Sequence, residues 1–167
     1  MKLKFGEMWD ELGNPGLFVI TVNGTVDASG KLVMGAGIAE QAAKRWPRLP
    51  VALGRAFRLA GQRVSAKVYK LPFFVMPTLP SNNQRSAIAV LQTKYHFREM
   101  SSLDLIAEGL SGLTKWCDEN PGVTVNMPMP GTGYGRQPIN RVVPLVKNLP
   151  DNVFVWRYEY ERGDWML

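Results

Sequence analysis

The stretch VNGTVDASGKLVMGAGIAEQAAKRW, residues 22–46, joins three local patterns in a fixed order. It follows an apolar run at residues 16–22, passes through a loop with spaced glycines, and continues as a helical pattern. Across residues 37–46 apolar side chains recur every four residues with polar ones between them, which predicts an amphipathic helix that Pro47 ends. A strand, a loop and a helix in this order are the building unit of an α/β protein.

The rest of the chain alternates strand-like and helix-like segments. Short β-branched or aromatic runs bounded by turn residues predict further strands at residues 2–5, 66–69, 73–76, 87–93, 123–126 and 153–156. Helices are predicted at residues 49–59, at residues 102–119, and from Pro138 in the first helical position until Pro144 bends or ends the helix after two turns. Ser101 or Ser102 can cap the second of these, and residues 79–86 are expected to form a surface loop. The predicted architecture is a sheet covered by helices on both faces.

Length and composition fit one soluble domain spanning residues 1–167. A chain of 167 residues is typical of a single hydrophobic core, and the longest apolar run, at residues 16–22, is too short to cross a membrane. The first residues lack the apolar segment of a signal peptide, and the single cysteine, Cys117, gives no intrachain disulfide. We therefore expect a cytoplasmic protein without a membrane partner, and we expect it to be a monomer.

The net charge of +6 favours polyanionic partners, because a positive surface raises the local concentration of phosphates. Lysines and arginines are scattered from Lys2 to Arg162 with no run of five. A solvated basic surface and a nucleic-acid track are both consistent with this pattern.

Two familiar phosphate-binding motifs nearly match the first glycine loop. GTVDASGK has five residues between its glycines where a P-loop has four, and Leu32 stands where the Ser or Thr that binds magnesium is required. In GAGIAE, Glu40 replaces the third glycine of the dinucleotide fingerprint. Gly35 and Gly37 nevertheless lie at a helix start, where free N–H groups favour an anion; a tight turn is the alternative explanation. Asp27 in this loop is expected to cap a turn.

A second glycine loop, PMPGTGYGR at residues 128–136, follows another predicted strand. Its alternating glycines can form a backbone nest for a diphosphate, with Tyr134 as an aromatic lid. If the two strands are neighbours, the two loops face each other across one cleft. A ligand with two phosphates between two sugars needs such a cleft.

Three motifs together resemble the macrodomains, a family that binds ADP-ribose. MGAGIA at residues 34–39, after a strand ending in Asn23, resembles the first ribose–phosphate loop of the family, and PMPGTGYG resembles its second phosphate loop. TKYHFR at residues 93–98 is similar to a segment of the DarG-type antitoxins that remove ADP-ribose from DNA. MGAGIA and TK together also resemble the vertebrate terminal ADP-ribose glycohydrolase. The resemblance covers nearly the whole chain and implies a three-layer α/β/α fold with a mixed central sheet.

The resemblance also implies the residues of an ADP-ribose site. Glu7 stands where the family has an acid, usually Asp, that binds the adenine, and Trp156, or else Tyr158, stands where an aromatic ring covers it. The first loop would line the distal ribose and first phosphate, and the second would wrap the diphosphate with Tyr134 beside the distal ribose. The implied binding set is Glu7, Asn23, Met34, Gly35, Ala36, Gly37, Ile38, Gly131, Thr132, Gly133, Tyr134, Gly135 and Trp156.

Lys94 is the residue that would make this protein an enzyme. If its segment is extended, Lys94, His96 and Arg98 project together while Tyr95 and Phe97 face the core. Cationic neighbours and partial burial both disfavour an ammonium group, so we expect Lys94 to have a lowered pKa and to act as nucleophile or base. His96 and Arg98 are then candidate substrate contacts. The alternative is an edge strand with a solvated basic face.

Gly135 departs from the vertebrate enzyme, in which an aspartate at this position assists the lysine, and this weakens a mechanism that needs both residues. His96 is the sole histidine and Cys117 the sole cysteine, so we expect chemistry without a metal or other cofactor, with ADP-ribose as ligand or product. The expected function is binding of ADP-ribose and hydrolysis of an ADP-ribosyl linkage, foremost on DNA, with single-stranded DNA as partner. A non-catalytic ADP-ribose reader and an ADP-ribose 1″-phosphate phosphatase are the alternatives.

Overall fold

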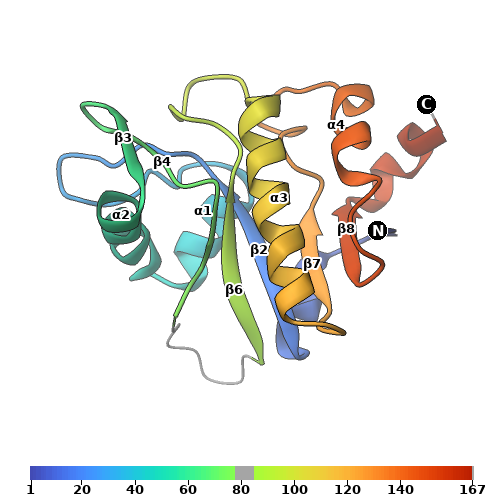
Figure 1. Ribbon diagram of the computed structural model, residues 1–167. Coiled ribbons are helices and arrows are strands. Elements are labelled where there is room, and N and C mark those ends of the chain that lie inside the picture. The colour runs from blue at the N-terminus through green and yellow to red at the C-terminus, as the bar shows by residue number, and fades with distance from the viewer. Residues whose placement is uncertain (78–84, 167) are drawn as a thin grey trace.

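The computed structural model describes residues 1–77 and 85–166, with side chains described as far as residue 163. Its main sheet has six strands in the order β1-β8-β7-β2-β6-β5 (Figure 1). All neighbouring pairs are parallel except β5 and β6, so the predicted mixed sheet is confirmed. The strands are β1 (Lys2–Phe5), β2 (Gly16–Val22), β5 (Phe73–Val75), β6 (Ser86–Gln92), β7 (Val125–Pro128) and β8 (Val153–Arg157).

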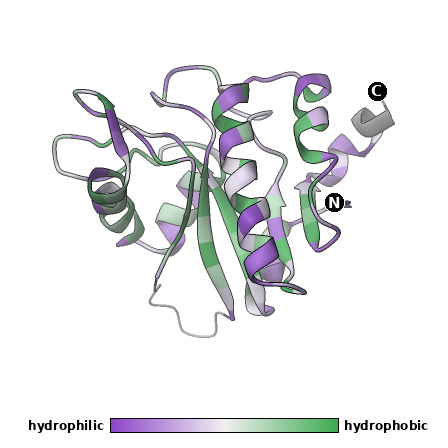
Figure 2. Cartoon of the chain, viewed as in Figure 1, coloured by the Kyte–Doolittle hydropathy of each residue, from purple (hydrophilic) through white to green (hydrophobic). Residues whose placement is uncertain are grey.

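Helices cover both faces of the sheet, as predicted. One hydrophobic core lies between the sheet and α1 (Gly37–Arg45) and α2 (Leu49–Ala60), and the other lies between the sheet and α3 (Leu103–Glu119) and α4 (Ile139–Val146). The central strand β2 supplies both cores, because Phe18 and Ile20 point to one face while Leu17 and Val19 point to the other. A strand buried on both faces reads as a continuous apolar run, as residues 16–22 do, and Figure 2 shows the same hydrophobic centre.

The predicted helix starts and ends are largely confirmed, with one shift. The hydroxyl oxygen of Ser102 accepts a hydrogen bond from the N–H of Leu105 at 3.2 Å and caps α3. Pro138 precedes α4 as its N-cap instead of occupying the first helical position, and the helix continues two residues beyond Pro144. Among the described residues, no helix combines the length and the apolar character needed to span a membrane.

Several elements differ from the prediction. A separate hairpin pairs β3 (Gln62–Ser65) with β4 (Val68–Lys70), but only a strand at residues 66–69 was predicted there. β3 has all four residues exposed, so it carries no alternating pattern to recognise. Two 3-10 helices, η1 (Met8–Gly13) and η2 (Glu159–Met166), were also unpredicted. The predicted surface loop at residues 79–86 lies almost entirely outside the described residues.

Candidate functional site

A cavity of about 750 Å³ lies at the carboxyl ends of the five parallel strands. Residues that follow β1, β2, β6, β7 and β8 all contribute to its lining. Its volume falls within the usual range for small-molecule sites, and ligands of open α/β sheets bind at this edge. The cavity is therefore the candidate functional site.

The first glycine loop forms one wall of the cavity and leads into α1. Ala36 is the N-cap of this helix and no side chain caps it, so the N–H groups of the first turn remain available to a ligand. Gly37 has a φ of +59°, a conformation that glycine adopts without strain. At Gly35 an added Cβ would have no atom within 4 Å. The loop therefore offers backbone N–H groups and open space to an anion.

Met34 does not belong to this wall, contrary to the expectation from the family resemblance. Its side chain is buried in the core on the α1 face and does not line the cavity. Asn23 does line the cavity, but both polar atoms of its amide are engaged with the backbone. The amide donates to the carbonyl of Val33 at 2.8 Å and accepts from the N–H of Thr25 at 2.9 Å. Asn23 therefore shapes the first loop.

The second glycine loop forms the opposite wall, because β7 pairs directly with β2. Gly131, Thr132, Gly133, Tyr134 and Gly135 all line the cavity. The Tyr134 ring reaches across to the first loop, with its Cδ2 atom 3.4 Å from the position that a Cβ on Gly37 would take. The prediction that the two loops face each other across one cleft is confirmed.

Gly135 is enclosed by its neighbours in a way that excludes a side chain. A Cβ at this position would collide with the Ser101 hydroxyl oxygen and would lie 2.7 Å from the carbonyl oxygen of Gly131. The Gly135 carbonyl also accepts a hydrogen bond from the N–H of Ser101 at 2.9 Å. An aspartate cannot replace Gly135 without displacing this loop, so the absence of that acid is fixed by packing.

We expect Gly135→Ala to lower the free energy of unfolding by about 1–3 kcal/mol, the usual cost of overpacking a tight site. Gly133→Ala, in the same loop, should change it little, because a Cβ at Gly133 would have no atom within 4 Å. Urea unfolding of the two variants measures the difference. Equal stability of both would contradict the packing of Gly135 against Ser101.

Lys94 enters the cavity immediately after β6, where buried groups hold its backbone. The side-chain amide of Gln92, fully buried, donates to the Lys94 carbonyl at 3.2 Å and to the Tyr69 carbonyl at 2.9 Å. The N–H of Thr93 donates to the Val22 carbonyl at 2.9 Å. These contacts fix the start of the Lys94 segment against β2 and β4.

The environment of Lys94 disfavours its charged form. Partial burial lowers the pKa of the Lys94 ammonium below its ordinary value, and the nearby Arg136 guanidinium lowers that pKa further. The predicted direction of the pKa is confirmed, but the cationic neighbour is Arg136, not His96 or Arg98. Arg136 also has a φ of +60°, uncommon for a residue other than glycine and often found at functional sites.

The prediction that residues 94–98 alternate along an extended strand is wrong. β6 ends at Gln92, and the chain turns after Lys94, where the N–H of Phe97 donates to the Thr25 hydroxyl at 3.2 Å. Phe97 consequently lines the cavity, while His96 and Arg98 lie outside its lining. Contact of those two residues with a substrate that extends beyond the cavity stays a prediction.

Among the described residues, two carboxylates line the cavity, and both are far from Lys94 along the chain. They are Glu7, which accepts a hydrogen bond from the N–H of Trp9 at 3.3 Å, and Glu161, which pairs with Arg157. Asp27 caps a turn, as predicted: the Ser29 hydroxyl donates to it at 2.7 Å and this bond lowers the pKa of Asp27. The charged groups that shift the pKa of Lys94 include no acid.

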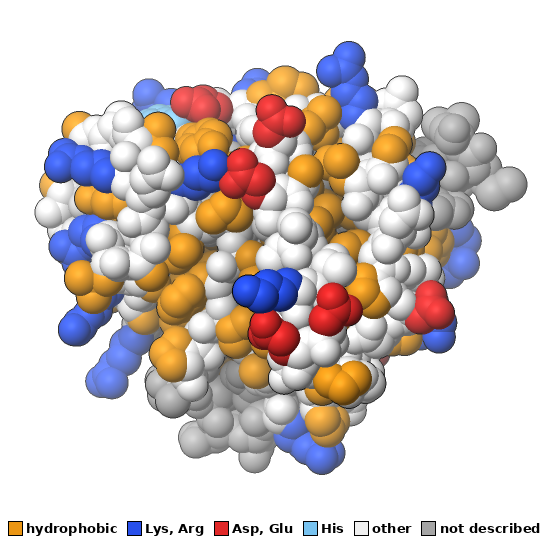
Figure 3. Space-filling view, in the orientation of Figure 1, with side chains coloured by type: hydrophobic (Ala, Val, Ile, Leu, Met, Phe, Trp, Pro, Cys, Tyr) orange, Lys and Arg blue, Asp and Glu red, His pale blue; other side chains and the backbone are white. Residues whose placement is uncertain are grey.

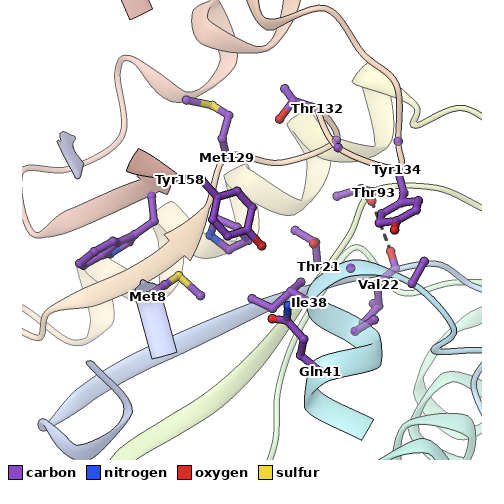
Figure 4. A pocket seen from close by; sticks show the side chains of 18 of the residues that line it. Met8, Thr21, Val22, Ile38, Gln41, Thr93, Met129, Thr132, Tyr134 and Tyr158 are labelled. Carbon is purple, nitrogen blue, oxygen red and sulfur yellow. Dashed lines mark hydrogen bonds between the residues drawn. The ribbon is translucent and has the colours of Figure 1, made fainter. Parts of the chain in front are cut away.

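Aromatic side chains gather where β8 ends. The indole N–H of Trp156 donates to the Asn126 side-chain oxygen at 2.9 Å, which orients this ring in the cavity wall. Tyr158 and Tyr160 stack on each other with ring centroids 5.4 Å apart and also line the cavity. Figure 4 shows Tyr158 across the cavity from Tyr134, with Ile38 and Gln41 of α1 on the side between them. The part of the cavity wall at the end of β8 is therefore aromatic, and we call it the aromatic end.

Comparisons with known proteins agree with this geometry. No protein-family model and no curated protein matches the chain. Among solved structures, the macrodomain of Thermus aquaticus DarG is 26% identical with a TM-score of 0.66, and the alignment covers 95% of this chain and 97% of that one. The macrodomain of Mycobacterium tuberculosis DarG is 27% identical with a TM-score of 0.66, over 92% and 96% of the two chains. Thermosipho africanus DarTG in complex with ADP-ribose is 20% identical with a TM-score of 0.70, over 96% of this chain and 42% of that one.

The chain has the macrodomain fold. The expected three-layer architecture is therefore confirmed, and the two glycine loops of this macrodomain lie on opposite walls of one cavity. Arg136 and Tyr160 line the cavity and Gln92 holds the backbone of Lys94, but the sequence did not predict any of these three roles. Arg136 directly follows the second glycine loop and Tyr160 continues the aromatic series WRYEY, so both had a local signal. Gln92 had none, because its role depends on contacts with β4.

We expect Lys94→Met to raise the thermal unfolding midpoint of the macrodomain at pH 7. The pKa of Lys94 is lower in the folded than in the unfolded protein, so the charged ammonium lowers the free energy of unfolding at pH values below the pKa that Lys94 has in the folded protein. This loss of stability decreases as pH rises through that pKa, and it vanishes above the ordinary lysine pKa of about 10.4. Thermal melts from pH 7 to pH 11 should therefore show the advantage of the variant shrinking. A constant difference would contradict the lowered pKa.

Proposed function

We propose that this macrodomain binds ADP-ribose in the cavity and hydrolyses the bond that joins ADP-ribose to DNA. The observation that carries the proposal is a lysine of lowered pKa at the side of a cavity whose facing walls are two glycine loops. The similarity to DarG macrodomains and the ADP-ribose complex of Thermosipho africanus DarTG support it.

The proposed ligand fits the distribution of chemical groups around the cavity. The uncapped start of α1 and the glycines of the second loop receive the diphosphate through backbone N–H groups. The adenine lies at the aromatic end, near Glu7, Trp156 and Tyr158. The distal ribose then lies between Tyr134 and Lys94. This orientation brings the anomeric carbon to the lysine.

Hydrolysis requires that the bond from the anomeric carbon to the modified base breaks and that a water oxygen takes its place. The water loses one proton, and the departing base gains one. In its neutral form the Lys94 amine can accept the proton of the water, or it can attack the anomeric carbon itself and be displaced by water afterwards. Binding of the diphosphate holds the sugar in position for either route.

The packing of Gly135 supports a second candidate, a reader that binds ADP-ribose without cleaving its linkage. The cavity would bind the ligand equally well, but among the described residues no acid shifts the pKa of Lys94, and none fits at Gly135. The two candidate functions differ only in whether the protein cleaves the ADP-ribosyl linkage after binding.

A substrate panel tests the proposal. Wild-type protein is titrated with ADP-ribose by calorimetry and is incubated with ADP-ribosylated single-stranded DNA, ADP-ribosylated protein and ADP-ribose 1″-phosphate. We expect binding of ADP-ribose and its release from the DNA. Binding of ADP-ribose without its release from any of the three substrates would identify a reader. Release of ADP-ribose from ADP-ribose 1″-phosphate alone would identify a phosphatase. No binding at millimolar ADP-ribose would exclude all three functions.

A further inference from the structure

The positive charge of the protein is concentrated in one part of the fold, which we call the basic lobe. It comprises residues 23–72, between β2 and β5, with α1, α2, β3 and β4. These residues contain nine of the 20 Lys and Arg but two of the 14 Asp and Glu, which is a net charge of +7 and leaves −1 for the rest of the chain. Within this segment the cations are spaced along a loop, two helices and a hairpin, so they form no run of five.

Most cations of the basic lobe are exposed and form no ion pair with a carboxylate of the described residues. Lys44 pairs with Glu40 and Lys70 pairs with Glu108. The other seven are exposed and form no ion pair with a carboxylate of the described residues: Lys31, Arg45, Arg48, Arg55, Arg58, Arg63 and Lys67. Figure 3 shows Lys and Arg side chains along the edge where Figure 1 places α2 and β3, with no acidic side chain along that edge of this face.

The basic lobe adjoins the Lys94 side of the cavity through backbone hydrogen bonds. The N–H of Val26 donates to the Lys67 carbonyl at 2.8 Å, which joins the turn between β3 and β4 to the loop after β2. In that loop, the N–H of Gly24 donates to the Tyr95 carbonyl at 2.8 Å, one residue after Lys94. A polymer attached to the anomeric carbon at Lys94 would therefore have the loop of residues 24–26, which belongs to the basic lobe, as a neighbour.

We propose that the basic lobe binds the phosphate backbone of the DNA strand that carries the ADP-ribosylated base. This inference rests on the proposed function for the position of the modified base, and adds the surface that holds the strand. Exposed Lys and Arg neutralise phosphates and release their counterions, so such binding is strong at low salt and weak at high salt. The lobe contributes affinity for the strand without reading its sequence.

The test uses two triple variants of the full chain with the same change in net charge. The lobe variant is Lys31→Gln, Arg55→Gln, Lys67→Gln. The control variant is Lys115→Gln, Arg141→Gln, Lys147→Gln, whose side chains are also exposed, on α3 or at α4, across the sheet from the lobe. Fluorescence anisotropy measures binding of an unmodified single-stranded oligonucleotide over a series of salt concentrations. Calorimetry with ADP-ribose and a thermal melt show that both variants are folded with an intact cavity.

We expect the lobe variant to bind the oligonucleotide about tenfold more weakly than the control. Its salt dependence should be shallower by about 0.7 in log–log slope for each phosphate that the variant no longer neutralises. ADP-ribose affinity should be the same in both. Equal DNA affinity of the two variants would overturn the inference. So would binding of phosphatidylserine vesicles, but not of the oligonucleotide, by the wild type, since Leu59 and Val51 are also exposed on the lobe.

Failure of the proposed function is distinguishable from failure of this inference. If wild type releases no ADP-ribose from modified DNA, the proposed hydrolysis is wrong whatever the anisotropy shows. If wild type does release it, the lobe variant should raise the KM for modified oligonucleotide and leave the KM for an ADP-ribosylated mononucleoside unchanged. An unchanged KM for the oligonucleotide would overturn the role of the lobe alone.

Discussion

Lys94→Ala is expected to release ADP-ribose from DNA at least about 100-fold more slowly than the wild type, because a positioned base or nucleophile contributes on the order of 10²–10⁴ in rate. The affinity for ADP-ribose should stay nearly unchanged, since the glycine loops hold the diphosphate. The measurement is single-turnover release from ADP-ribosylated single-stranded DNA, beside calorimetry with ADP-ribose.

Lys94→Arg is the control that separates charge from proton transfer. The guanidinium keeps the positive charge but stays protonated at all working pH values, so this variant should be as slow as Lys94→Ala. Full activity of either variant would contradict the role of Lys94. Reduction with borohydride during turnover would show whether the amine attacks the sugar, because a trapped adduct adds the mass of the sugar nucleotide to the protein.

The pH dependence of hydrolysis follows from the same pKa. Only the neutral amine reacts, so the rate should rise as pH increases through the lowered pKa of Lys94 and then level off. Arg136→Gln removes the guanidinium that lowers this pKa, so the rise should move to higher pH. The same dependence of rate on pH in Arg136→Gln and wild type would show that Arg136 does not act through Lys94.

Gly35→Val is expected to weaken ADP-ribose binding by 100-fold or more, about 2.7 kcal/mol, with little change in the thermal unfolding midpoint. A Cβ at Gly35 meets no atom within 4 Å because that space is the cavity itself, so the valine side chain folds without strain and occupies the volume of the ligand. It also obstructs the N–H groups at the start of α1. Calorimetry with ADP-ribose measures the loss.

Gly13→Val is the matched control for this substitution. A Cβ at Gly13 likewise meets no atom within 4 Å, and Gly13 is not part of the cavity lining. This variant should bind ADP-ribose as the wild type does. Normal binding by Gly35→Val would show that the first glycine loop is not the wall that receives the diphosphate.

Local patterns in the sequence predicted the secondary structure well where burial imposes a period. The apolar run at residues 16–22 and the four-residue spacing at residues 37–46 were confirmed as β2 and α1 because each element buries a definite face. The exposed β3 was missed because a strand with no buried face has no such period. The same reasoning failed at residues 94–98, where contacts with the loop after β2 turn the chain.

The sequence by itself determined the strand–loop–helix unit and the two glycine loops, because these depend on residue type and on neighbours along the chain. The interest of Lys94 came from the resemblance to the macrodomains. Only the tertiary structure decided that β2 and β7 are adjacent, that Arg136 lowers the pKa of Lys94, and that Ser101 excludes a side chain at Gly135. It also decided that the loop after β2, in the basic lobe, lies against the residue that follows Lys94, because the N–H of Gly24 donates to the Tyr95 carbonyl. Each of these joins residues far apart in the chain, and their distance in space depends on how the whole sheet assembles.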